Sequence, residues 1–258
     1  MRILPILKFV YRGLLTGLPS LTYNPFTKLN FHSPFSVLPY STYINYKLDS
    51  NQFEYINNYL LEKNSSLVPE KISMENFRNK NYFMSVNIYN CSVPIIPSDS
   101  DVTRCEINTY VKDKVDGTGT LILDYVSNAL SMDPVNIFKM KDNITFIKDK
   151  NDLNGHCSSE NIDLDMRLKI KDTDSIFKIS DNLIDYSDKI FYLNSIYDKL
   201  FYDTSLTRAK LLKPSFIKKL YFRFGNLTLS EPDSVFYFKN DIKFAGSIWH
   251  NLYTIDDF

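Results

Sequence analysis

Charged and polar side chains that could bind a small ligand alternate with apolar ones along one short stretch. Arg104, Glu106 and Asn108 are separated by Cys105 and Ile107. A period of two is typical of a β-strand, in which successive side chains point to opposite faces. Arg104 and Glu106 would then share one face, where Arg104 could orient a carboxylate ligand through paired hydrogen bonds. The same spacing also fits a charged rim that faces solvent, and the sequence leaves both interpretations open.

The residues after this strand predict how it is held in place. A polar break that contains Gly117 and Gly119 supplies turn residues, and residues 120–126 are nearly all apolar. Two strands joined by so short a break predict an antiparallel β-hairpin whose second strand is buried on both faces. Ser127 can cap a helical segment that runs toward Lys139.

A further strand and a helix are predicted before the hairpin. Residues 41–47 suggest the first strand, and Asp49 or Ser50 can cap a helix over residues 51–63. Residues 82–89 alternate well enough for another strand. The predicted hairpin therefore follows at least one strand and one helix.

The second half of the chain predicts more strands. Residues 163–170 alternate charged and apolar side chains, which is typical of a half-exposed strand, and residues 175–180 are its expected partner. Residues 142–161 are polar and lack periodicity. Because Asn154-Gly155 is a turn signal, this segment is predicted to be a long surface loop or the end of a hairpin.

Taken in order, these segments resemble the acetoacetate-decarboxylase-like superfamily, most closely its branch of uncharacterised proteins with a domain of unknown function. The resemblance covers roughly residues 34–251, and no single motif carries it. It implies one β-dominated α+β domain, whose curved, mostly antiparallel sheet closes into a cone or barrel around a cavity, with peripheral helices. The segments that carry it are the hairpin with CEINTYV, SLVPEKISMENFRNKNYFMSVNIYNCSVP before it, and FYLNSIYDKLFYDTSLTRAKL and PDSVFYFKNDIKFAGSIWHNL after it.

The resemblance also implies where a catalytic lysine would lie. Decarboxylases of this superfamily form a Schiff base through a lysine amine whose pKa is lowered by an apolar pocket and a neighbouring cation. Their lysine is preceded by proline and followed by a second lysine. Lys141 is the nearest equivalent here and Lys139 the second, but the proline is missing and Asp142 replaces the second lysine. An aspartate beside an amine raises its pKa, so a Schiff-base role for Lys141 is disfavoured.

The family further places a glutamate on the central strand, facing the interior. Glu106 matches it by chemistry, whereas an alignment on residues 109–111 would put Arg104 there. The predicted ligand-binding residues are therefore Arg104, Glu106 and Asn108. They predict a small-ligand-binding or accessory protein, with a small carboxylate as ligand, that has lost the Schiff-base lysine. The alternative is a decarboxylase or lyase of a small β-keto acid, with Lys141 and Glu106 catalytic; the sequence does not decide whether the chain is an enzyme.

Composition narrows the classes of partner. A chain of 258 residues can bury one sizeable core. Beyond residue 48 it carries 25 basic and 30 acidic residues. A mildly acidic chain binds the phosphates of nucleic acids poorly. Three scattered cysteines predict reduced thiols in an intracellular protein. The three histidines lack metal-site spacing and no glycine-rich phosphate loop occurs, so neither a metal nor another cofactor is predicted. The oligomeric state is left open.

The first 33 residues form a predicted extension in front of a domain that spans residues 34–258. They are free of acidic residues, and Arg2, Lys8 and Arg12 fall within one arc of a helix. The apolar run is too short and too often interrupted by charge to span a bilayer. This pattern predicts a mitochondrial presequence. A membrane-surface or partner-binding arm, or a plain extension of a cytoplasmic protein, are the alternatives.

Overall fold

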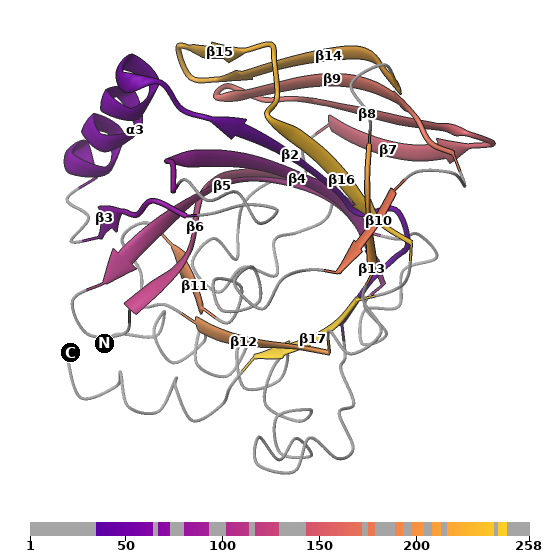
Figure 1. The fold of residues 1–258 in the computed structure, drawn as a ribbon, viewed down its shortest axis with the longest axis horizontal. Helices are drawn as coiled ribbons and strands as arrows, with labels where there is room; N and C mark the ends of the chain where they lie inside the picture. The colour runs from indigo at the N-terminus through magenta and orange to yellow at the C-terminus, as the bar shows by residue number, and fades with distance from the viewer. Residues whose placement is uncertain are drawn as a thin grey trace, which may run out of the picture.

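The computed structural model consists of seventeen strands and one helix within the residues that it describes (Figure 1). These residues are 35–63, 67–72, 80–92, 102–113, 117–128, 143–171, 175–178, 189–192, 198–203, 208–212, 216–239 and 242–246. The elements are β1 (Phe35–Val37), β2 (Thr42–Lys47), α3 (Ser50–Glu62), β3 (Val68–Pro69), β4 (Phe83–Ser92), β5 (Val102–Asp113), β6 (Gly117–Ser127), β7 (Asn143–Asp149), β8 (Asp152–Ser158), β9 (Ile162–Lys169), β10 (Ser175–Lys178), β11 (Lys189–Tyr192), β12 (Asp198–Asp203), β13 (Arg208–Leu211), β14 (Ile217–Phe224), β15 (Leu227–Leu229), β16 (Ser234–Phe238) and β17 (Ile242–Gly246).

The strands form two sheets. The large sheet has twelve strands in the order β10-β13-β16-β2-β4-β1-β17-β12-β11-β6-β5-β3, with β4 also paired to β5, and the small sheet has the order β15-β14-β9-β8-β7. The small sheet lies over one face of the large sheet, which we call the sandwich face (Figure 1). The large sheet curls away from it, so that β12 and β17 lie opposite β2 and β4 (Figure 1). We call this second side the inner face.

The prediction of a β-dominated α+β fold with mostly antiparallel pairing is confirmed. Within the described strands, β6 with β11 is the parallel exception. The predicted closure into a cone or barrel is not found there, since the large sheet ends at the edge strands β10 and β3. The physical reason is the shortness of three strands of this sheet: β1, β11 and β17 have 3, 4 and 5 residues and allow few pairs each.

The predicted central hairpin is confirmed as β5 and β6. Arg104 pairs with Ser127, Glu106 with Tyr125, and Asn108 with Ile122. The register shifts between Ile107 and Asn108, because β6 places one extra residue there. Such a bulge bends a strand and increases its twist. The sheet therefore bends at Asn108, one of the predicted ligand-binding residues.

The predicted helix begins where its capping signal lies. Asp49 is the N-cap of α3, and its Oδ1 accepts a hydrogen bond of 2.9 Å from the backbone N–H of Gln52. The Gln52 side chain accepts one of 2.9 Å from the backbone N–H of Asp49, which completes a capping box. Ile56 and Leu60 of this helix are buried. Among the described residues no helix has the length and apolar character needed to cross a membrane.

The hydrophobic core lies between the two sheets. Ile44, Val86 and Ile107 are fully buried on the sandwich face, as are Leu164 and Phe222 of the small sheet. Each of these strands alternates, so the side chains between the apolar ones point to the opposite face. The apolar side chains of β2, β4 and β5 thus pack in the core, and the side chains that alternate with them line the inner face.

Two predictions about the small sheet are wrong. Residues 142–161 are not a long surface loop but contain the hairpin of β7 and β8, and its turn lies at Lys150, with a positive φ of 50°, and not at Asn154-Gly155. Gly155 lies inside β8, where a Cβ would be 3.0 Å from Met166 Cγ and 3.1 Å from Ile88 Cδ1. The glycine therefore serves close packing between the sheets and not a turn. Residues 175–178 pair with β13 in the large sheet, whereas β9 pairs with β8 and β14.

Several predictions concern parts of the chain outside the described residues. They are the extension over residues 1–33 with its presequence, the helical segment that runs toward Lys139, and the position of Lys141. These stay predictions.

Candidate ligand-binding site

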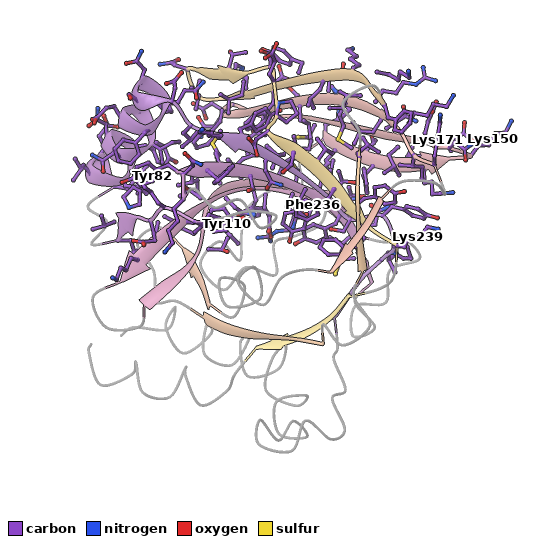
Figure 2. All side chains as sticks on the ribbon, in the orientation of Figure 1. Tyr82, Tyr110, Lys150, Lys171, Phe236 and Lys239 are labelled. Atoms are coloured by element: carbon purple, nitrogen blue, oxygen red, sulfur yellow. The ribbon has the colours of Figure 1, made fainter. Side chains whose placement is uncertain are left out.

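Polar side chains form rows across the inner face of the large sheet. Residues that pair directly on neighbouring strands point to the same side of a sheet, so the register gives the membership of each row. Tyr110 and Phe236 lie on the side away from the small sheet (Figure 2). One row consists of Phe236, Tyr43, Asn87, Glu106 and Tyr125; the next consists of Ser234, Asn45, Ser85, Asn108 and Ile122.

Glu106 is the centre of a buried ion pair. Arg104 Nε donates a hydrogen bond of 2.6 Å to Glu106 Oε1, and the two side chains are 12% and 11% exposed. Tyr89 OH donates a second hydrogen bond of 2.9 Å to the same oxygen. The guanidinium of Arg104 lies 3.9 Å from the centre of the Tyr125 ring. The alternative of a solvent-facing charged rim is therefore wrong.

The ion pair changes what Arg104 can offer to a ligand. Its Nε already binds a carboxylate, and that carboxylate belongs to Glu106 of the same strand. Both hydrogen bonds to Glu106 end on Oε1, and no described residue donates to Oε2. The pair thus presents an acceptor oxygen of Glu106.

Asn108 presents a second acceptor. Its side chain is 4% exposed, and no described residue donates a hydrogen bond to its Oδ1. Its cross-strand neighbour Ser85 donates its one proton to Asn45 Oδ1 at 2.7 Å. Tyr110 OH lies 3.3 Å from Ser85 Oγ and must be the donor of that bond, since the serine proton is already used. The hydroxyl of Ser85, next to Asn108 in this row, therefore has no proton left to donate to Asn108.

The phenols around the site remain protonated at neutral pH. Burial raises the pKa of Tyr110 to about 12. Burial, with the negative charge of Glu106 as a further cause, raises the pKa of Tyr89 well above its usual value. Tyr89 is therefore a hydrogen-bond donor to Glu106 over the whole physiological range.

Three of the four predicted site residues come together. Arg104, Glu106 and Asn108 share one buried face of β5, as their spacing predicts. Lys141, the fourth, lies outside the described residues. Sequence reasoning missed Tyr89 and Ser85, which complete the site from β4. Their signal was present, because Ser85, Asn87 and Tyr89 also repeat with a period of two.

This chain is similar to solved structures of other proteins. No family model matches it, and no curated protein does. The acetoacetate decarboxylase of Legionella pneumophila subsp. pneumophila str. Philadelphia 1 is similar with 14% identity over 83% of this chain and 86% of that chain, at a TM-score of 0.49. An acetoacetate-decarboxylase-like enzyme from Sphingomonas wittichii RW1 is similar with 7% identity over 87% and 96%, at a TM-score of 0.43.

At these identities and TM-scores, no activity is carried over from these structures to this chain.

Proposed function

We propose that this chain binds a small polar molecule on the inner face of its large sheet, at Glu106 and Asn108. The observation that supports it best is the buried Asn108 Oδ1, to which no described residue donates. An unsatisfied buried acceptor costs about 1–3 kcal/mol, and folded proteins rarely keep one without a reason. A bound molecule with a hydrogen-bond donor removes that cost.

We also propose that the inner face borders an enclosed interior, in which such a molecule is shielded from water. The support is a series of strand pairings, β6 with β11, β11 with β12, and β12 with β17. β1 then pairs with β17 on one side and with β4 on the other. Burial of Asn45, Ser85 and Asn108 on this face agrees with the proposal.

The proposal includes small carboxylates as ligands, which Arg104 would bind although its Nε is bound to Glu106. A binding or accessory role, without Schiff-base chemistry, is favoured by the surroundings of Lys141. Asp142 follows it directly, and no proline precedes it. These features favour a protonated amine, which is not nucleophilic.

The binding proposal is tested by retention of small molecules. Purified full-length protein is dialysed against a protein-free extract of cell metabolites, washed and unfolded, and the released compounds are identified by mass spectrometry. We expect at least one compound to be retained by the wild type and by Asn143→Leu, a control on exposed β7, and to be lost from Asn108→Leu. Equal retention by all three proteins would contradict binding at this site.

The alternative of a decarboxylase or lyase is tested at Lys141. Schiff-base chemistry needs an amine that is largely neutral near pH 7, several units below the usual lysine pKa of about 10.4. With Asp142 as the next residue we expect borohydride reduction in the presence of acetoacetate to leave Lys141 unmodified, as judged by peptide mass spectrometry. A covalent adduct that disappears in Lys141→Ala would place the chain among the enzymes.

A further inference from the structure

Two acceptor oxygens of the inner-face site lack a donor among the described residues. Glu106 Oε2 and Asn108 Oδ1 receive no hydrogen bond from any described residue. The nearby hydroxyl donors are engaged, since Tyr89 binds Glu106 and Ser85 binds Asn45. Molecules that complement two acceptors must bring at least two donors of their own.

Among the residues that the structure describes, the buried charges of the site balance. Glu106 is the only charged residue among the buried polar ones that the structure describes, and Arg104 neutralises it at 2.6 Å. A carboxylate ligand would add an unbalanced negative charge to a buried site, and an ammonium ligand an unbalanced positive one. Either carries a desolvation cost that an uncharged molecule avoids. The charge balance therefore favours a neutral ligand.

The two acceptors also set the distance between the donors. Glu106 and Asn108 are two residues apart on one strand, which corresponds to about 6.6 Å along β5. Hydroxyl groups that reach both must be set several atoms apart. The row of Glu106 continues past Asn87 to Tyr43 and Phe236, whose rings stack at 5.2 Å.

We infer that the ligand is an uncharged polyol or sugar, with hydroxyl groups that donate to Glu106 Oε2 and to Asn108 Oδ1. This inference rests on the proposed function and names the class of ligand. The ion pair with Arg104 and the bond from Tyr89 fix the Glu106 carboxylate, so that Oε2 is presented in one orientation. Asn108, held at the bulge of the hairpin, supplies the second contact.

Thermal unfolding of the full chain tests the inference with four defined probes. These are myo-inositol and glucose as neutral polyols, acetoacetate as the anion, and ethanolamine as the cation. We expect both polyols, or one of them, to raise the unfolding midpoint of the wild type with increasing concentration. For Asn108→Leu the polyol affinity falls by about tenfold or more, because a contact to a buried acceptor is lost. Asn143→Leu is the control and keeps the wild-type response.

Asn108→Asp provides a second variant of nearly unchanged shape. Its carboxylate oxygens still accept from hydroxyl groups, and its added negative charge should favour ethanolamine over acetoacetate, because the site is then no longer neutral. If acetoacetate or ethanolamine stabilises the wild type and neither polyol does, the inference is overturned while the proposed function stands. If no probe acts and the metabolite experiment retains nothing at Asn108, both are overturned.

Discussion

Arg104→Met is expected to lower the free energy of unfolding by about 3–5 kcal/mol. The substitution keeps most of the length of the side chain and removes the charge. Glu106, which is 9% exposed, is then left as a buried carboxylate whose one remaining hydrogen bond from the described residues comes from Tyr89. An uncompensated buried charge is among the most destabilising changes that one substitution can make. Urea unfolding measured by fluorescence gives the value.

The chain offers a matched control for this prediction. Arg167 and Asp152 form an ion pair with the same N···O distance of 2.6 Å, but their side chains are 59% and 25% exposed. Arg167→Met should therefore change the unfolding midpoint far less. The double variant Arg104→Met with Glu106→Leu should recover most of the loss, since neither charge is then buried alone. Equal effects of Arg104→Met and Arg167→Met would show that the inner-face pair is not shielded from water.

Raising the pH from about 9 to about 11 is expected to destabilise the protein by about 4 kcal/mol. Burial raises the pKa of Tyr110 to about 12, and it also raises the pKa values of Tyr46 and Tyr89 above the ordinary value of 10. Above pH 10 the unfolded chain loses these phenolic protons while the folded chain keeps them. Stability is thus fully present below pH 10 and falls as the pH rises toward the folded pKa values.

Variants assign this alkaline loss to the buried phenols. Tyr46 is 1% exposed, and its OH has no hydrogen-bond partner among the described residues. Tyr46→Phe should therefore raise the urea midpoint at neutral pH and reduce its fall between about pH 9 and 11. Tyr221→Phe, at a side chain that is 40% exposed, is the control. A fall that is equally steep in the wild type and in Tyr46→Phe with Tyr110→Phe would contradict the assignment.

Local patterns in the sequence predicted the elements that carry the site. The alternation through Arg104, Glu106 and Asn108 predicted β5, and the glycines after it predicted the hairpin. Asp49 and Ser50 were the two predicted caps of α3, and Asp49 takes this position; a cap can be predicted because it acts on residues three positions away. Such signals depend on neighbours in the sequence, so one chain is enough to recognise them.

Other features depend on contacts between distant residues. The pairing of β10 with β13 joins segments about thirty residues apart, and no local pattern selects that partner. Gly155 carries the same asparagine-glycine signal as a turn, although it is required for packing against Met166. The sequence pattern of the polar residues of β5 fitted a solvent-exposed face as well as an interior one. Only the partners from β4, Tyr89 and Ser85, identify their face as buried.

The most direct measurement is an experimental structure of the full chain at a resolution that locates bound molecules, grown with myo-inositol or glucose. The proposal predicts a ligand whose hydroxyl groups lie within hydrogen-bond distance of Glu106 Oε2 and Asn108 Oδ1, with the Arg104–Glu106 pair intact. The account would be contradicted if Asn108 Oδ1 accepted a hydrogen bond from a side chain of the protein itself and no molecule occupied the inner face.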